Sequence, residues 1–224
     1  MSAISLRQDI HYPESDGKPM GETEIHIREI IYLFEALDEH LREVPEVYVG
    51  ADMLLYYVEG NPRKFVVPDV FATRGVPRGE RRIYKLWEEG RPPSLIVEVT
   101  SDSTRNEDIV RKKALYEQLG VEEYVLYDPL QDYLRPPLQG FRLADGRYQP
   151  IPTGTDGAIL SQTTGVTLRI EERGIRALHT ATGEPILSNE EVRAAHQATK
   201  ERARVAEDEL ARLRAELDRL RSER

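Results

Sequence analysis

The 224-residue chain contains no cysteine. Disulfide bonds, zinc–thiolate sites and cysteine nucleophiles are therefore excluded, and the composition fits a reducing compartment. The chain also lacks any apolar run of about eighteen residues, the minimum for a membrane-spanning helix. Its N-terminus does not show the basic-then-apolar pattern of a signal peptide. We expect a cytoplasmic globular protein with no membrane span.

Several catalytic motifs are missing as well. The five histidines are scattered along the chain, and no Gly-x-Ser-x-Gly elbow is present, which disfavours serine- or histidine-based hydrolysis. No Gly-x-x-x-x-Gly-Lys loop is present either, so an NTPase is disfavoured.

Positive charge is also scarce, because 40 Asp and Glu outweigh 31 Lys and Arg to give a formal net charge of −9. Such a balance argues against tight, nonspecific binding to nucleic acid. Residues 74–113 are an exception, with ten basic against seven acidic residues, a local net of +3. This run is either a phosphate-binding patch or an ordinary solvated loop, and its densest part holds Arg78, Arg81, Arg82 and Lys85.

Hydrophobic periodicity predicts an α/β domain. Apolar residues recur at helical spacing in 22–42, and two β-rich runs joined by a turn predict a hairpin. A short helical piece follows. A continuous β-branched run then predicts a strand buried on both faces, and the strand–helix–strand order after it predicts a parallel, right-handed βαβ unit. The β-rich runs are 47–58 and 64–73, the helical piece is 83–89, and the βαβ unit spans 94–100, 106–119 and 123–127.

The rest of the chain divides into two regions of different character. Residues 130–187 carry frequent turn signals and predict short hairpins, whereas residues 1–20 predict an extended arm. From residue 189 onward glycine and proline are absent. Apolar residues there follow alternating three- and four-residue spacing, typical of a coiled coil. We therefore predict one globular domain at 1–187 and a coiled-coil tail at 188–224. The tail would form a homodimer or higher homo-oligomer, unless it folds back on its own domain.

Two carboxylates interrupt apolar strands. Glu98 lies within Leu-Ile-Val-Glu-Val, and Asp69 lies within Val-Val-Pro-Asp-Val-Phe. An unpaired buried charge is costly, so either residue alone could simply belong to a structural ion pair. Two of them in neighbouring strands can converge on a divalent metal, because Mg²⁺ accepts one or two carboxylates and keeps several waters.

A basic partner for these carboxylates is expected on the helix after Glu98. Side chains alternate along a strand, so position 100 shares the face of Glu98, but Thr100 stands there. Lys112 lies on the apolar stripe of the next helix, and Lys113 is rotated further round. Asp108, one turn before Lys112, is placed to pair with it.

These residues resemble a known family. The Pro-Asp at 68–69 and the Glu-Val-Thr at 98–100 look like the PD-(D/E)XK nuclease pattern with its lysine displaced. A longer string of matching positions is similar to the bacterial restriction endonuclease family called Uma, and the resemblance covers about residues 12–135. The string includes Glu98, Val99, Thr100, Ser101, Ser103, Thr104, Arg105, Asp108, Lys112, Leu115, Tyr116, Gly120, Val121, Glu123, Tyr124, Asp128 and Pro129.

The resemblance implies a restriction endonuclease-like core, a mixed central sheet flanked by helices. It implies that Asp69, Glu98 and the backbone carbonyl of Val99 bind Mg²⁺, for which Mn²⁺ could substitute. Lys112 would orient the attacking water or stabilise charge on the phosphate.

The family also places an acidic residue early in its first helix. Glu22 is similar to that residue, and His26, one turn later, could reach the same site. Thr100 departs from the pattern and leaves open which of Lys112 and Lys113 serves the site.

Three readings follow from the sequence. The first is a metal-dependent endonuclease acting on DNA. The second is a catalytically silent nuclease-fold protein that binds DNA or a protein partner through its coiled coil. The third is another metal-dependent phosphoester hydrolase on the same fold. Sequence preference and biological pathway are left open by all three.

Overall fold

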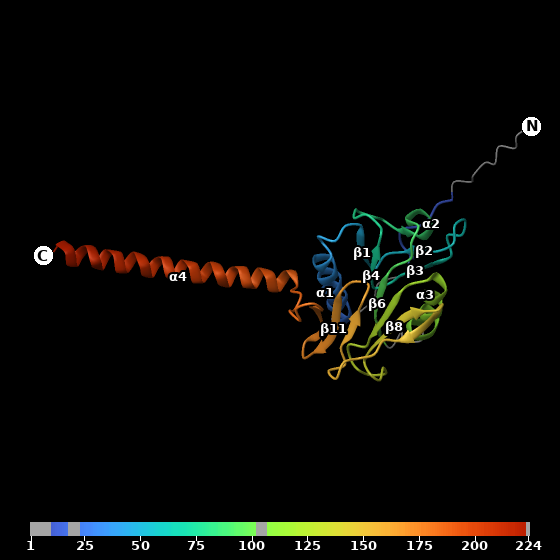
Figure 1. The fold of residues 1–224 in the computed structure, drawn as a ribbon. Coiled ribbons are helices and arrows are strands. Elements are labelled where there is room, and N and C mark those ends of the chain that lie inside the picture. Colours follow the sequence, from blue (N-terminus) through green and yellow to red (C-terminus); the bar gives the residue numbers. More distant parts are fainter. Residues whose placement is uncertain (1–9, 18–22, 102–106, 223–224) are drawn as a thin grey trace, which may run out of the picture. The chain divides into compact units, whose positions relative to one another are not determined.

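The structure is a computed structural model that describes residues 10–17, 23–101 and 107–222 (Figure 1). It divides into two compact units, 1–186 and 187–224. Glu22 lies outside the described residues. None of the helices in the described ranges is long and apolar enough to cross a membrane.

The first unit is built on a mixed sheet. Its order in the described residues is β1-β4-β6-β7-β8-β9, and β6 and β7 are parallel whereas the other neighbours are antiparallel. This arrangement confirms the predicted α/β class and the parallel pairing within the βαβ unit. The strand bounds are β1 Val47–Ala51, β4 Val70–Arg74, β6 Leu95–Val99, β7 Glu123–Tyr127, β8 Leu138–Ala144 and β9 Arg147–Pro150.

The predicted hairpin over 47–73 is divided between two sheets. Strand β1 pairs with β4 in the central sheet, while β2 and β3 pair with each other and β2 also pairs with β5. Pro68 contributes to the break because it has no N–H for a sheet ladder. Asp69 therefore directly precedes β4 and is not inside a strand, which corrects the expectation. The small elements are β2 Leu55–Tyr56, β3 Phe65–Val66, β5 Tyr84–Lys85 and α2 Leu86–Glu89.

Helix α1 (Glu24–His40) begins at Thr23, whose hydroxyl accepts a hydrogen bond from the His26 N–H. The helix packs against β1, β4 and β12. Its buried residues Leu33 and Leu37 join one core cluster that includes alternate residues of β6, such as Val97. The opposite face of the sheet has a second core cluster.

The second cluster lies beneath the helix that follows β6. Ile96 and Tyr116 both belong to it, so the side chains of β6 that share the Ile96 face point toward this helix. The sequence predicts one α-helix over 106–119. The structure instead has a π-helix, η1 (Glu107–Lys112), which continues as α3 (Lys113–Leu119). Gly120 ends α3 with φ +82°, the left-handed conformation common at helix C-termini.

The turns predicted in 130–187 are confirmed as hairpins, but they belong to two sheets. Strands β8 and β9 extend the central sheet, whereas β10, β11 and β12 form an antiparallel sheet of their own. Their bounds are β10 Ile159–Ser161, β11 Val166–Glu171 and β12 Gly174–His179.

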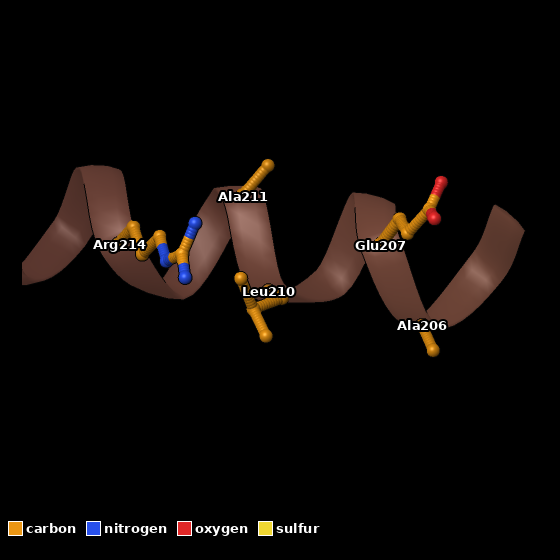
Figure 2. Close-up of a pocket in the computed structure, with 5 residues that line it drawn as sticks. All are labelled: Ala206, Glu207, Leu210, Ala211 and Arg214. Atoms are coloured by element: carbon orange, nitrogen blue, oxygen red, sulfur yellow. The ribbon is translucent and has the colours of Figure 1, made fainter. Parts of the chain in front are cut away.

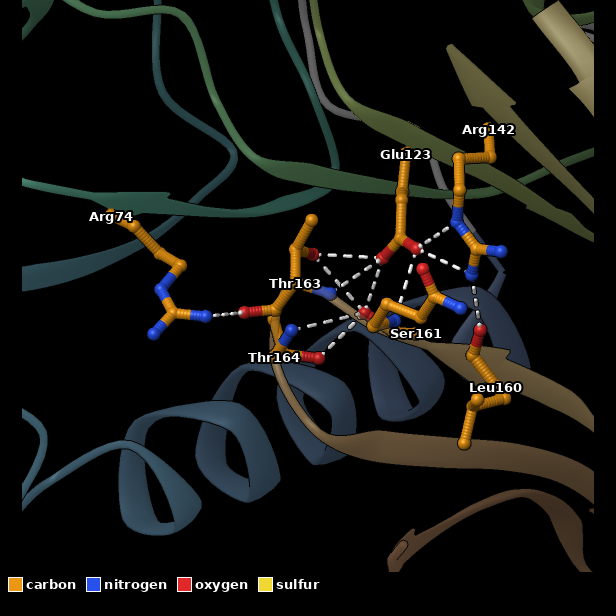
Figure 3. Close-up of polar contacts among 8 residues, drawn as sticks. Arg74, Glu123, Arg142, Leu160, Ser161, Thr163 and Thr164 are labelled. Carbon is orange, nitrogen blue, oxygen red and sulfur yellow. Dashed lines mark hydrogen bonds and ion pairs between the residues drawn. The ribbon is translucent and has the colours of Figure 1, made fainter. Parts of the chain in front are cut away.

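A buried carboxylate connects this second sheet to the central one (Figure 3). Glu123, at the start of β7, accepts hydrogen bonds from the Ser161 hydroxyl (2.6 Å), the Thr163 hydroxyl (2.8 Å) and the Gln162 N–H (3.0 Å), and it pairs with Arg142 at 2.8 Å. Burial alone raises the pKa of Glu123, but these donors together outweigh it and hold the pKa below its usual value.

The second unit contains one long helix, α4 (Asn189–Ser222). The leucines of its predicted apolar stripe are about half exposed, from 47% at Leu210 to 58% at Leu213. The helix is thus confirmed, while the coiled coil stays a prediction.

Candidate active site

Asp69 and Glu98 are brought together by the pairing of β4 with β6. Val70 lies opposite Val97 in this antiparallel register, and continuing the register by one residue places Asp69 opposite Glu98. The Val99 N–H donates to Asp69 Oδ2 at 2.7 Å, and the Asp69 N–H donates to Glu98 Oε2 at 3.4 Å. The two carboxylates predicted from separate segments therefore share one site.

Lys112 enters the same site from η1. Its Nζ donates to Glu98 Oε2 at 2.8 Å and to the Val67 carbonyl at 3.1 Å, and it lies 3.1 Å from Asp108 Oδ1. The Asp108–Lys112 pairing expected from helical spacing is confirmed. Lys112 lies in the last turn of a π-helix, a rare conformation that is frequent at functional sites.

The site is buried and carries excess negative charge. Glu98 is fully buried, Asp108 is 1% exposed, and the side chains of Lys112 and Asp69 are 12% and 17% exposed. When all four groups are ionised, three carboxylates face one ammonium, which leaves a formal charge of −2. Such an excess is costly away from water unless protons or a cation neutralise it.

The acid–base properties of the site follow from this arrangement. Burial raises the pKa of Asp69 to about 6, although Lys112 and the Val99 N–H act against it. Burial likewise raises the pKa of Glu98 well above its usual value, with Lys112 again opposing. Burial by itself lowers the pKa of Lys112, but the neighbouring carboxylates outweigh it and raise that pKa above its ordinary value. Lys112 is therefore a permanent cation at neutral pH.

The sequence interpretation missed the role of Tyr116. Its hydroxyl donates to Glu98 Oε1 at 2.7 Å, the oxygen that Lys112 does not contact. Burial raises the pKa of Tyr116 well above its usual value, so the hydroxyl stays protonated and can keep donating. The sequence interpretation counts Tyr116 on the apolar stripe and among the positions that resemble the family, without a role in the site, yet its position four residues after Lys112 puts both side chains on one face of the helix.

Lys113 and Thr100 have partners elsewhere. The Nζ of Lys113 lies 3.3 Å from the centre of the Phe141 ring, a cation–π contact. The hydroxyl of Thr100, at the position where the PD-(D/E)XK pattern has lysine, is hydrogen-bonded to the Tyr133 hydroxyl. The geometry thus favours Lys112 over Lys113 as the lysine beside the carboxylates.

The first helix also reaches this region. His26, which is 5% exposed, places Nε2 at 3.9 Å from Asp69 Oδ2. This position agrees with the expectation that His26 could reach the site. The corresponding expectation for Glu22 falls on a residue outside the described ranges.

The basic run 74–113 is largely neutralised where it is densest. Ion pairs engage each of its four central residues with a carboxylate. These pairs are Arg78–Asp38 at 2.6 Å, Arg81–Glu89 at 2.7 Å, Arg82–Glu14 at 2.5 Å and Lys85–Glu88 at 2.9 Å. The run is therefore a weaker source of positive potential than its composition indicates.

The residues at the site suit a hard divalent cation. In the described ranges, no group of three or more His, Asp or Glu side chains is arranged to hold a metal ion. Mg²⁺ does not require such a group, because one or two carboxylates with several waters are enough. Asp69 and Glu98 provide two carboxylates, and the negative excess of the cluster fits a +2 charge.

Similarity to curated proteins and to solved structures is limited. No curated protein matches the chain. Three solved chains match, among them a crystal structure of a protein from Anabaena variabilis described as a putative nuclease belonging to DUF820. That structure is 14% identical with a TM-score of 0.47, and the match covers 63% of this chain and 74% of the other.

The family comparison is more extensive. A sequence model of the Uma2 family, described as "putative restriction endonuclease", matches residues 3–171. The match extends past residues 12–135, which carry the resemblance in the sequence, and it includes every residue of the cluster around Glu98. The chain belongs to the Uma2 family of restriction endonuclease-like proteins.

Proposed function

We propose that this protein is a Mg²⁺-dependent endonuclease that hydrolyses DNA phosphodiester bonds at the site formed by Asp69, Glu98 and Lys112. The observation that carries the proposal is the convergence of these three side chains, from the residue before β4, from β6 and from a π-helix, in one buried cluster. Family membership supports nuclease activity. The metal, the substrate and the role of each residue are our inference.

In this proposal Asp69 and Glu98, with the Val99 carbonyl, hold the metal. When bound there, Mg²⁺ would polarise a phosphate oxygen and lower the pKa of a water molecule. Asp69 is oriented by the Val99 N–H and Glu98 by the Tyr116 hydroxyl, so both carboxylates are fixed before a ligand arrives. Such preorganisation avoids the cost of moving the ligands when the metal binds.

Lys112 contributes charge and not proton transfer. Because its pKa is raised, it is a poor general base at neutral pH. Its ammonium group instead suits stabilisation of the negative charge that develops on the phosphate, or orientation of the attacking water. The ion pair with Asp108 fixes the side chain for this role.

The proposal is tested by nicking of supercoiled plasmid with Mg²⁺ or Mn²⁺. We expect Asp69→Asn, Glu98→Gln and Lys112→Met each to reduce the rate by a factor of about 100 or more. Lys113→Met is the matched control, because it removes a neighbouring lysine that contacts Phe141. Equal activity in all five proteins, wild type included, would show that a contaminant cuts the plasmid.

A second measurement separates metal binding from activity. Mg²⁺ should raise the melting temperature of the wild type in proportion to the logarithm of its concentration. Asp69→Asn keeps the shape of the side chain but removes its charge, so the shift should be lost. The same Mg²⁺ shift in Asp69→Asn would remove Asp69 from the metal site.

The catalytically silent alternative is favoured by one observation. The basic residues Arg78, Arg81, Arg82 and Lys85 are already paired with carboxylates, so tight DNA binding has little support. If the protein is catalytically silent, plasmid should stay intact at every metal concentration, even where Mg²⁺ still raises the melting temperature.

A further inference from the structure

The tail helix α4 exposes a continuous apolar stripe. Taking Ala203 as a heptad position a, the sequence places apolar residues at successive a and d positions up to the end of the helix. In the single chain the leucines of this stripe remain 47–58% exposed. The stripe is Ala203, Ala206, Leu210, Leu213, Leu217 and Leu220, with a at 203, 210 and 217 and d at 206, 213 and 220.

The surface of the helix is hollowed beside this stripe. The depression is lined by Ala206, Glu207, Leu210, Ala211 and Arg214. Figure 2 shows Ala206 and Leu210 projecting from one side of the helix and Ala211 from the other. The short side chain of Ala206 next to Leu210 leaves the kind of space that receives a side chain from a facing helix in coiled-coil packing.

The charges flanking the stripe indicate which helix fits. In a parallel, in-register pair, a residue at position g faces the e residue five positions later in the partner. Arg202 (g) would face Glu207 (e), and Glu209 (g) would face Arg214 (e). Both pairs are attractive, and the two-fold symmetry repeats each of them across the interface.

An antiparallel pair is disfavoured by the same positions. There e residues face e residues of the partner, and g residues face g residues. Most e positions of α4 are basic, so like charges would meet along one edge, which is destabilising. The e positions are Arg193, Lys200, Glu207, Arg214 and Arg221.

We propose that α4 pairs with α4 of a second copy of this chain as a parallel, in-register, two-stranded coiled coil. The partner is specified by self-complementary charge and by the unburied leucines, independently of the proposed nuclease function. Since the first unit precedes α4 in the chain, a parallel coil joins both first units at the same end of the coil. If the proposed function holds, the dimer would then carry two nuclease sites, and each site would experience the other at an effective concentration of about millimolar.

Engineered cysteines in the full chain test the orientation directly, because the natural sequence contains none. Leu220→Cys is at a d position near the end of α4, and Ala215→Cys is at the outer f position of the preceding heptad. In a parallel coil, mild oxidation should convert most of Leu220→Cys to a disulfide-linked dimer and leave most of Ala215→Cys unlinked. Light scattering of the wild type should give the mass of two chains.

Charge reversal gives a second test that does not depend on oxidation. Glu209→Lys and Arg214→Glu should each raise the dimer dissociation constant, on the order of tenfold, by turning two attractive pairs into repulsive ones. The double variant should restore it, because the reversed charges face each other again only in the parallel register.

Four results would overturn the proposal. A monomeric mass would mean that the stripe is covered within its own chain, and a mass above two chains would exclude the two-stranded form. A dimer in which Leu220→Cys does not crosslink, or in which the double variant is not restored, would indicate another orientation or interface. None of these measurements requires nuclease activity, so their failure is distinct from failure of the proposed function.

Discussion

Removing the charge of Lys112 should destabilise the protein in a strongly pH-dependent way. In Lys112→Met, fully buried Glu98 and Asp108 at 1% exposure lose the ammonium that lies 2.8 and 3.1 Å from them. Removing one partner of a buried ion pair costs about 3–5 kcal/mol. We expect a loss near the lower end of that range, about 3 kcal/mol at pH 8, because a carboxyl that takes up a proton limits the cost.

The direction of the pH effect follows from the pKa values. Burial already raises the pKa of Glu98 above its usual value, and that of Asp69 to about 6, with Lys112 acting in the opposite direction. Without Lys112 both pKa values rise further. A carboxyl whose pKa is higher in the folded than in the unfolded state favours folding below its unfolded pKa, and that advantage is lost as the pH rises through the folded value. The variant should therefore be closer to wild-type stability at pH 5 than at pH 8.

Urea unfolding followed by circular dichroism at pH 5 and pH 8 measures both effects. Lys113→Met is the control, since it loses a cation–π contact worth about 0.5–1 kcal/mol and no buried ion pair. Lys112→Arg keeps the positive charge and should recover part of the stability. The reasoning is refuted if Lys112→Met and Lys113→Met have equal stability at pH 8, or if the stability that Lys112→Met loses relative to wild type is as large at pH 5 as at pH 8.

Two further predictions concern the fold. Glu123→Ala should cost about 3 kcal/mol because it leaves the buried Ser161 hydroxyl and other donors unpaired. The pKa of Glu123 is lower in the folded than in the unfolded state, so its stabilising effect is present above the unfolded pKa and is lost as the pH falls through the folded pKa. Acidification should therefore reduce the stability of the variant less than that of the wild type. Gly174→Ala should cost about 3 kcal/mol, because φ is +131° and a Cβ would lie 2.3 Å from Glu29 Oε1. Chemical denaturation checks both, and a loss below about 1 kcal/mol in either variant would contradict its explanation.

The local sequence pattern was sufficient to predict the structural features that depend on residues close together in sequence. The β-branched run around Glu98 predicted a strand that is fully buried, and the strand–helix–strand order predicted the parallel pairing of β6 with β7. Helical spacing also placed Lys112 near Asp108. A period of two or of about 3.6 residues fixes which side chains share a face, and a short strand–helix–strand connection favours parallel pairing of its two strands.

The tertiary structure decided what depends on residues far apart in sequence. Only the β4–β6 pairing sets Asp69 against Glu98, 29 residues away, and only the packing of α3 on the sheet brings the Tyr116 hydroxyl to Glu98. The pairing of Arg78 with Asp38, 40 residues earlier, could likewise not be predicted from local pattern. Periodicity reports which face a side chain occupies, but what it meets there is set by strand register and long-range packing.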